Sequence, residues 1–423
     1  MKSSPDHPRE PGARSGGANA RRPWYGRRVL LGVTGGIAAY KSIQLARDLT
    51  ELGAAVDVVL TASAREFVGA ISFEALTGRA VHTDLIATGS ALAHIRLARG
   101  ADVVCIAPAT ADFLARAAIG RSDDLLTAIL LATRAPVLLC PAMNDRMWAH
   151  PQTLRNAAHV RDVLGYTLVG PAVGPLAFGE GEGAGRMVEP AEIIEHVGRA
   201  LELENGLRGK RVVVTAGPTR EPVDAVRVLT NRSSGRMGYA VAAAAWRRGA
   251  EVTLISGPAD VRPPVGVELL RVETAEQMKD AVAHSIAGAD VLVMAAAVAD
   301  FRPAAPATQK IKKEAGLTAI ELEPAPDVLR STIENRTPDL LVVGFALETD
   351  NPLENARRKL AQKALDLIVL NRANETGAGF EVDTNRVTIV QKDDVVEELP
   401  LLPKHEVAEV LLDRITVQLA ARS

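Results

Sequence analysis

The stretch that decides the fold is AGPTREPVDAVRVLTNRSSGRMG, residues 216–238. It follows the strand-like run 211–215 and leads into an Ala-rich helix pattern at 237–248, which Gly249 ends. A strand, a polar crossing and a helix N-terminus place backbone N–H groups and the positive end of a helix dipole against an anion. The stretch therefore predicts an α/β unit that binds phosphate or carboxylate groups at the edge of its sheet.

Length and composition limit the class of protein. A chain of 423 residues is too long for one ordinary core and indicates two domains. Aromatic residues make up only 3% of the chain, and the 47% hydrophobic share is mostly Ala, Val and Leu, as in buried parallel sheets. The formal net charge of −2 provides no basic field for nucleic acid or an anionic membrane, so we expect neither partner.

The N-terminus and the cysteines indicate a cytoplasmic protein. Residues 1–26 are rich in Pro, Gly, Ser and Arg and predict a disordered extension. The apolar run after Arg28 is broken by Gly35 and Gly36 and continues into a helix pattern, so we expect neither a signal peptide nor a membrane span. Cys105 and Cys140 lie in apolar strand-like runs and are expected to be reduced core residues.

Strand and helix patterns alternate in both halves of the chain. The first half has a strand at 29–33, a helix at 37–52 with apolar residues Ile37, Tyr40, Leu45 and Leu49, and a strand at 56–60. The second half repeats this plan at 211–215, 237–248 and 251–256. The fold class is therefore α/β, with two Rossmann-like or flavodoxin-like three-layer domains in tandem and mostly parallel sheets. A helix pattern at 191–203 and turn residues at 204–210 place the domains at 27–205 and 206–423.

Two similar segments occupy corresponding places in the halves: ADVVCIAPATADF at 101–113 and ADVLVMAAAVADF at 289–301. Duplication and convergence of two Ala-rich strands explain the likeness equally well. In either case both segments end at the carboxyl edge of a strand, where open α/β sheets bind ligands.

The first Gly turn, TGGIA at 34–38, lacks the GxGxxG pattern of dinucleotide sites. The strand at 56–60 is followed by Thr61, Ala62 and Ser63 instead of an acidic residue that would hold a ribose. Hydroxyls and backbone amides at two strand ends suit the terminal phosphate of a mononucleotide. An ordinary structural turn explains Gly35 and Gly36 as well.

Six ordered motifs of the first half resemble those of the flavin-containing cysteine decarboxylases: GGIAAYKS (35–42), HIRL (94–97), APATADF (107–113), DDLLT (123–127), PAMNDRMW (141–148) and GEGEGAGRM (179–187). The resemblance implies an FMN-dependent oxidative decarboxylation of phosphopantothenoylcysteine to 4'-phosphopantetheine. A saturated carboxylate cannot lose CO₂ without an electron sink, and flavin oxidation of the thiol creates one.

The resemblance also implies roles for individual residues. His94 would be the base and Asn144 a substrate-positioning amide. A half-buried helix-capping histidine and a turn asparagine are the alternatives. Residues implied to bind FMN are Gly35, Gly36, Ile37, Thr61, Pro108, Ala109, Thr110 and Ala111.

Two positions depart from the family pattern. Phe178 stands where bacterial members usually carry a flap cysteine that donates a proton, and neither cysteine of this chain matches that position. Water, another side chain, or the loss of the reductive half-reaction remain open. Asp123 replaces an asparagine of some relatives, so no role is carried over to it.

The second half resembles phosphopantothenate–cysteine ligase in the stretch 216–238 and in AAAVADFRP (295–303), KIKK (310–313), PDVL (326–329), GFALET (344–349) and RRKLAQKALDLIVLN (357–371). Amide formation needs an activated carboxylate, which CTP would supply as an acyl-cytidylate with pyrophosphate as the leaving group. Asn231 would hold the activated acyl group. Residues implied to bind CTP are Met294, Ala295, Ala296, Asp300, Lys310, Asp327, Val328, Leu329, Arg330, Phe345, Lys359 and Lys363.

Lysines 310, 312, 313, 359 and 363 would neutralise the polyphosphate, and Mg²⁺ would bridge its oxygens, with protein ligands for the metal unknown. Lys310 lies in a Pro-, Ala- and Thr-rich loop that can act as a lid. The alternatives are a solvated helix face for Lys359 and Lys363, and a turn cap for Asp300.

The order of the halves, over about residues 27–415, resembles that of the bifunctional coenzyme A biosynthesis flavoproteins. We therefore expect a cytoplasmic enzyme that ligates cysteine to phosphopantothenate and then decarboxylates the product. By resemblance it is a homo-oligomer with trimeric decarboxylase units and dimeric ligase units. The alternatives are a ligase with an impaired decarboxylase domain, because of Phe178, and a non-enzymatic flavin-binding regulatory subunit.

Overall fold

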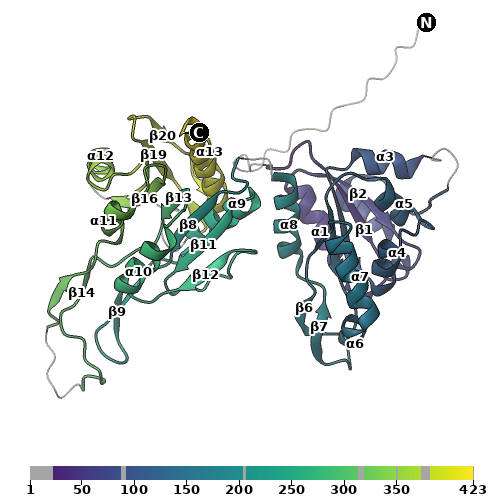
Figure 1. Cartoon of the computed structure of the whole chain (residues 1–423), viewed down its shortest axis with the longest axis horizontal. Coiled ribbons are helices and arrows are strands. Elements are labelled where there is room, and N and C mark those ends of the chain that lie inside the picture. Colours follow the sequence, from purple (N-terminus) through teal and green to yellow (C-terminus); the bar gives the residue numbers. More distant parts are fainter. Residues whose placement is uncertain are drawn as a thin grey trace, which may run out of the picture.

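The computed structural model of the chain describes residues 22–86, 92–202, 206–312, 319–348, 351–372 and 382–422. Figure 1 shows two α/β units that follow each other along the chain. Most of the predicted extension, residues 1–21, and residues 203–205 at the predicted domain boundary lie outside the described residues.

The sheet of the first unit is wholly parallel, and its Val- and Leu-rich strands are buried from end to end in the middle of the sheet. Consecutive parallel strands require crossovers, which the helices between them supply. The spatial order of the strands is β2 (Ala55–Leu60), β1 (Arg28–Val33), β3 (Val103–Ala109), β4 (Val137–Pro141) and β5 (Thr167–Leu168).

Helices cover both faces of this sheet, and each face has its own apolar core. On one face lie α1 (Tyr40–Glu51), α2 (Ala70–Thr77) and α8 (Pro190–Glu202). On the other lie α3 (Ala93–Gly100), α4 (Ala111–Ala118), α5 (Leu125–Ala132) and α7 (Pro151–Asp162). A short helix α6 (Asp145–Ala149) and a hairpin of β6 (Ala172–Pro175) and β7 (Glu182–Arg186) pack together beyond the sheet.

The second unit has an eight-stranded sheet in which six parallel strands are extended by two further strands, each antiparallel to the strand before it. The order is β12 (Glu268–Arg271), β11 (Glu251–Ser256), β8 (Arg211–Ala216), β13 (Val291–Met294), β16 (Leu341–Glu348), β17 (Leu367–Arg372), β19 (Val387–Gln391) and β20 (Val396–Glu398). Its parallel strands follow the Rossmann order 3-2-1-4-5-6, whereas the first sheet has the flavodoxin-like order 2-1-3-4-5. The predicted fold class is confirmed.

The helices of the second unit also form two layers. One face is covered by α9 (Arg236–Arg247) and α13 (Lys404–Arg422), and the other by α10 (Ala275–Ser285), α11 (Val328–Ser331) and α12 (Pro352–Gln362). Short antiparallel pairs extend beyond the sheet: β9 (Arg220–Pro222) with β10 (Val228–Thr230), β14 (Phe301–Pro303) with β15 (Leu322–Pro324), and β18 (Thr384–Asn385) with β21 (Leu402–Pro403).

The predicted helix at 37–52 is a 3₁₀ turn (Ile37–Ala39) followed by α1. Leu45 and Leu49 are fully buried as expected, but Ile37 is 67% exposed and Tyr40 60% exposed. Helical periodicity showed that these residues share a face, but it did not show that the first turn of this face is exposed.

Helices α8 and α9 hold the two units against each other (Figure 1). Arg247 of α9 donates a hydrogen bond to Glu195 of α8 at 2.7 Å, and the Arg199 guanidinium lies 4.6 Å from the Trp246 ring centre. Trp24, which precedes the first strand, is buried at the same junction and donates to Glu202 at 2.7 Å.

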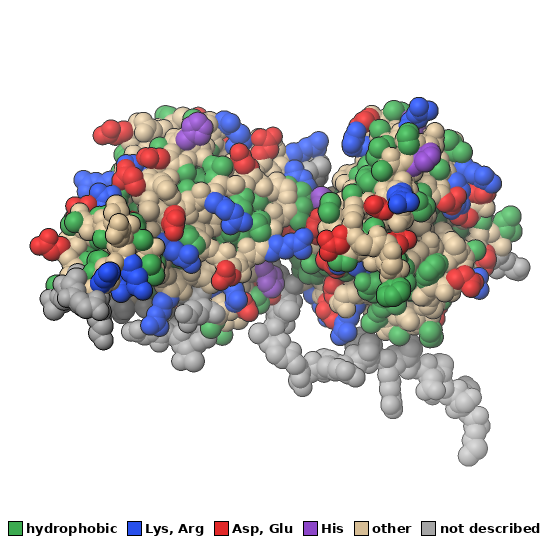
Figure 2. All heavy atoms as spheres, turned by 90° about the horizontal axis from the view of Figure 1, so that it is seen from below, with side chains coloured by type: hydrophobic (Ala, Val, Ile, Leu, Met, Phe, Trp, Pro, Cys, Tyr) green, Lys and Arg blue, Asp and Glu red, His purple; other side chains and the backbone are tan. Residues whose placement is uncertain are grey.

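On the face shown in Figure 2, basic and acidic side chains alternate over both units and form no continuous basic patch. Among the described residues, no helix is long and apolar enough to cross a membrane.

Candidate functional site

The first candidate site lies where β1 and β3 meet their helices on opposite faces of the sheet. This switch in strand order is where open α/β sheets bind ligands, and it is the FMN position in flavodoxin-like sheets. Thr110 caps α4 by accepting a hydrogen bond from the Phe113 backbone N–H at 3.3 Å. Thr34 joins the two strand ends, because its hydroxyl donates to the Pro108 carbonyl at 2.8 Å and accepts from the Thr110 N–H at 3.2 Å.

The two glycines after β1 have different surroundings. A Cβ on Gly35 would lie 2.4 Å from the Ser63 Cβ and 2.7 Å from its backbone carbon. A Cβ on Gly36 would lie 3.7 Å from the Thr110 Cγ2, an ordinary van der Waals contact, so this position is not closely packed. Thr61 is buried beside them, with its hydroxyl 3.2 Å from that of Ser63. The predicted phosphate residues therefore lie at the ends of three neighbouring strands, β1, β2 and β3.

His94 lies in the first turn of α3. It is not the helix cap, because that position is Leu92, whose side chain makes no cap hydrogen bond. The His94 Nδ1 atom is buried and has no hydrogen-bond partner among the described residues. A buried ring nitrogen without a partner is costly in a purely structural residue, so this atom fits a role that a ligand completes.

Asn144 is the N-cap of α6, and its Oδ1 accepts a hydrogen bond from the Arg146 N–H at 2.9 Å. Asn144 therefore has the turn role that was its alternative. The hydrogen bond uses only its side-chain oxygen, so the amide nitrogen can still contact a substrate. The backbone beside it is held by the hairpin, because the Met143 N–H donates to the Gly185 carbonyl at 2.9 Å.

Phe178 lies between β6 and β7 and is fully exposed. Cys105 and Cys140 are fully buried in β3 and β4, as predicted, and burial raises the pKa of the Cys140 thiol. Neither thiol is therefore available to replace a flap cysteine.

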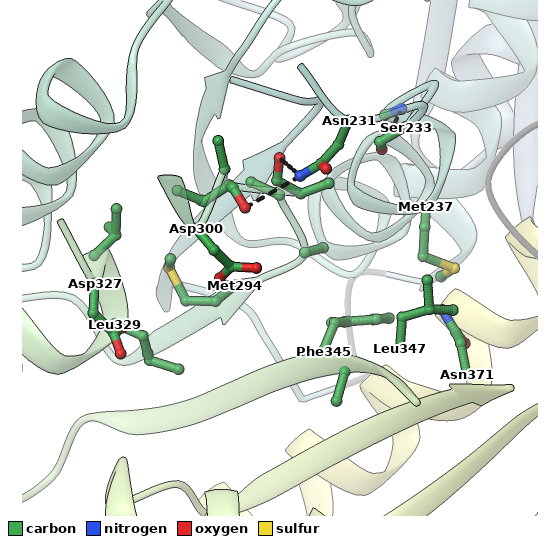
Figure 3. A pocket seen from close by; sticks show the side chains of 18 of the residues that line it. Asn231, Ser233, Met237, Met294, Asp300, Asp327, Leu329, Phe345, Leu347 and Asn371 are labelled. Carbon is green, nitrogen blue, oxygen red and sulfur yellow. Dashed lines mark hydrogen bonds between the residues drawn. The ribbon is translucent and has the colours of Figure 1, made fainter. Parts of the chain in front are cut away.

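The second site is a cavity of about 590 Å³ at the carboxyl edge of the larger sheet (Figure 3). It lies at the corresponding switch point, where β8 and β13 diverge. Its lining includes most of the predicted ligase residues: Asn231, Met294, Ala295, Ala296, Asp300, Asp327, Val328, Leu329, Phe345, Lys359 and Lys363.

Asn231 is held by two backbone carbonyls of the neighbouring strand end. Its Nδ2 donates to Ala297 at 3.0 Å and to Val298 at 3.2 Å, as the dashed lines in Figure 3 show. The Asn231 Oδ1 is thereby left facing the cavity region as an acceptor. Asp300 lies on the same loop and lines the cavity. The backbone carbonyl of Asp300, rather than its side chain, accepts the hydrogen bond from the Ala325 N–H that closes the turn.

Lys359 and Lys363 are paired with carboxylates at the cavity wall, so they are not a solvated helix face. The Lys359 Nζ lies 2.6 Å from Glu348, and the Lys363 Nζ lies 3.0 Å from Asp327. Burial acts to raise the pKa of Asp327, but the Arg330 backbone N–H and the Lys363 ammonium outweigh it, so that pKa lies below its usual value. Both cations are therefore fixed in place at this end of the cavity.

Lys310 and Arg330 are predicted CTP residues that do not line the cavity. Arg330 contributes its backbone N–H to Asp327. Lys310 is exposed on a loop that Asp224 anchors, because the buried Asp224 carboxylate accepts from the Ile311 N–H at 3.2 Å. Lys313 lies outside the described residues.

The cavity also has lining residues to which the sequence assigned no individual role: Ser233, Ser234, Arg236, Met237, Asn371, Asn385 and Lys404. The first four lie in the opening stretch, whose anion-binding character was predicted as a whole. The last three come together through long-range pairing of strands and the start of the final helix, for which no local sequence signal exists.

The two switch-point sites belong to a tandem of a flavodoxin-like and a Rossmann-like α/β unit. Residues 18–202 match the Flavoprotein family, and residues 207–419 match the DNA/pantothenate metabolism flavoprotein C-terminal domain. The chain is 48% identical over 412 residues to the coenzyme A biosynthesis bifunctional protein CoaBC of Mycobacterium tuberculosis (strain H37Rv), which covers 94% of this chain and 98% of the relative. It is 44% identical over 394 residues to the protein of that name from Bacillus subtilis (strain 168), covering 92% and 96%.

A crystal structure of the C-terminal domain of a CoaBC protein is 43% identical, covers 51% of this chain and 99% of that domain, and has a TM-score of 0.45. The chain belongs to the CoaBC family of bifunctional coenzyme A biosynthesis proteins. The predicted resemblance is thus confirmed, and with it an enzyme of coenzyme A biosynthesis that has decarboxylase and ligase halves. The alternative with an impaired decarboxylase domain is not favoured.

The packing of Gly35 makes a stability prediction. Gly35→Ala is expected to lower the free energy of unfolding by about 1–3 kcal/mol, because the new methyl group overlaps Ser63, including its backbone. Urea unfolding of the flavin-free protein measures this. Gly69→Ala is the control, since its Cβ would meet nothing closer than 3.8 Å. Equal stabilities of the two variants would show that the turn is not closely packed.

Proposed function

We propose that the first unit binds FMN and the second binds CTP with Mg²⁺, and that the residues described above perform the two reactions in sequence. The observation that carries the proposal is the position of both polar sites at the switch points of their sheets. Each has a helix N-terminus, hydroxyls or cations suited to phosphate.

The strand ends of the first unit provide groups that suit FMN. The half-buried backbone of Gly36, the N-terminus of α4 behind Thr110 and the hydroxyl of Thr61 suit a terminal phosphate. Ile37, Pro108, Ala109 and Ala111 would flank it with apolar and backbone atoms. When bound, FMN supplies the two-electron oxidation of the substrate thiol that makes loss of CO₂ possible.

Side chains of the protein would transfer protons and orient the substrate beside the flavin. The imidazole of His94 would take the thiol proton, and its unpartnered Nδ1 is the polar atom that ligand binding would satisfy. The amide nitrogen of Asn144 would hold the substrate, with its oxygen fixed by the cap of α6. Since both cysteines are buried, the final proton would come from water or from a side chain that a second copy supplies.

In the ligase half, a carboxylate oxygen of phosphopantothenate attacks the α-phosphorus of CTP, and pyrophosphate leaves. The cysteine amine then attacks the acyl carbon, and CMP leaves with the oxygen. The Lys359 and Lys363 ammonium groups would attract the nucleotide. Asn231, fixed by two backbone carbonyls, would position the pantothenate chain, whose hydroxyl or amide N–H can donate to the Asn231 Oδ1. Phe345, Met294, Val328 and Leu329 supply apolar contact.

Mg²⁺ would neutralise charge on the phosphates of the nucleotide, and it needs no complete set of protein ligands. The described residues contain no group of three or more His, Cys, Asp or Glu side chains arranged to hold a metal. From the family resemblance we also propose trimeric decarboxylase units, dimeric ligase units and a cytoplasmic location.

Pyrophosphate release without cysteine tests the ligase proposal. With CTP, phosphopantothenate and Mg²⁺, the full chain is expected to release an equimolar burst of pyrophosphate, because the acyl-cytidylate has no acceptor. EDTA should abolish the burst, and ATP should not replace CTP. A burst that survives EDTA would exclude the metal, and the absence of any burst would exclude the acyl-cytidylate.

A further inference from the structure

One end of the ligase cavity carries a buried polar corner, formed by Asn371, Asn385 and Lys404. The Asn385 Nδ2 donates to the Asn371 Oδ1 at 3.1 Å and so joins β18 to β17. Asn385 is only 1% exposed, and its Oδ1 has no hydrogen-bond partner among the described residues. A buried acceptor of this kind calls for a donor on the ligand.

The same corner carries positive charge. Lys404 begins α13, is 6% exposed and lines the cavity, and burial lowers the pKa of its ammonium group. Arg236 begins α9 and is paired with Asp383. The two helix N-termini and the two cations at this corner favour a bound anion.

An unpartnered acceptor beside a cation requires a ligand with a donor and an anion close together. The α-ammonium and α-carboxylate of an amino acid are separated by one carbon atom. CTP and phosphopantothenate also carry donors, in their hydroxyl, amide and amino groups, but none of these is as close to an anionic group as the ammonium of an amino acid is to its carboxylate. We propose that the polar corner is the cysteine site, with Asn385 accepting from the amine and Lys404 holding the carboxylate. This inference rests on the proposed ligase function.

The positions of the side chains along the cavity support placing cysteine at the polar corner. Figure 3 shows Asp327 and Leu329 at one end, Asn371 with Met237 and Leu347 at the other, and Asn231 between them. A nucleotide at the Asp327 end and an acyl group at Asn231 would leave the acyl carbon facing the polar corner. Met237 and Leu347 would offer apolar contact to the thiol-bearing carbon.

The first test is Asn385→Ala, examined in the full chain. The KM for cysteine should rise about ten- to a hundredfold, as expected when a hydrogen bond to a charged group is lost. The pyrophosphate burst without cysteine should persist, which also shows that the variant folds. A wild-type chain without the burst would refute the ligase proposal itself, whereas a variant that alone loses the burst would refute only the cysteine site.

Asn385→Asp separates an amino-acid site from a phosphate site. An aspartate keeps the acceptor for the amine, so the KM for cysteine should stay near that of the wild type. If the corner instead holds the phosphate of phosphopantothenate, repulsion will raise the KM for that substrate, and the proposal fails. Asn335→Asp is the matched control, because Asn335 is exposed and does not line the cavity.

The proposed contact between Lys404 and the cysteine carboxylate is tested with 2-aminoethanethiol, which is cysteine without its carboxylate. The wild type should use it at a KM at least tenfold above that for cysteine, and Lys404→Gln should remove most of this preference. If Lys404→Gln keeps the full preference for cysteine over 2-aminoethanethiol, Lys404 does not bind the cysteine carboxylate and the proposed site is wrong.

Discussion

The His94→Asn variant is expected to release CO₂ from phosphopantothenoylcysteine about 10²- to 10⁴-fold more slowly than the wild type, the usual effect of losing a general base. Asparagine keeps much of the size and polarity of histidine but cannot accept a proton near neutral pH. Because His94 Nδ1 has no partner among the described residues, the substitution breaks no structural hydrogen bond of that atom.

The measurement is CO₂ release under saturating FMN, with the flavin absorbance and the pyrophosphate burst recorded on the same sample. Both should be unchanged, because the substitution affects only the proton transfer. His159→Asn, in α7 of the same unit, is the control. Undiminished CO₂ formation in His94→Asn would refute the assignment of the base.

The Lys310→Gln variant is expected to slow pyrophosphate release about 10²- to 10³-fold, the range for losing one group that stabilises transition-state charge. Lys310 does not line the cavity, so its loop has to close over the nucleotide or reach the cavity of a second copy. Either movement starts from a loop whose base Asp224 anchors through the Ile311 N–H.

Rapid-quench measurement of the burst checks this prediction. Lys392→Gln is the control, because Lys392 is an exposed lysine outside the cavity. Lys310→Arg should recover part of the rate, since it restores the charge. A normal burst rate in Lys310→Gln would remove the loop from the mechanism.

The sequence predicted the sheets well because their signals are local. Apolar runs such as 29–33 and 211–215 became fully or almost fully buried strands, and the helix patterns at 191–203 and 237–248 were displaced by only one residue at each end. The similar segments at 101–113 and 289–301 proved to be β3 and β13, each adjacent to the first strand of its sheet.

The sites were predicted less completely, for a physical reason. Asn371 and Asn385 meet because β17 pairs with β19, and Lys404 joins them from the start of α13. Such contacts depend on the order of strands, which the periodicity of a single segment does not contain. The same limit explains Ile37 and Tyr40, whose shared face was predicted but whose exposure was not.

The central claim is that each unit binds its own nucleotide at the switch point of its sheet. The most direct measurement is calorimetric titration of the FMN-saturated full chain with CTP and Mg²⁺, with the flavin absorbance monitored in parallel. We expect equimolar binding of both nucleotides and no displacement of FMN. Displacement of FMN by CTP, or failure of either nucleotide to bind, would contradict the claim.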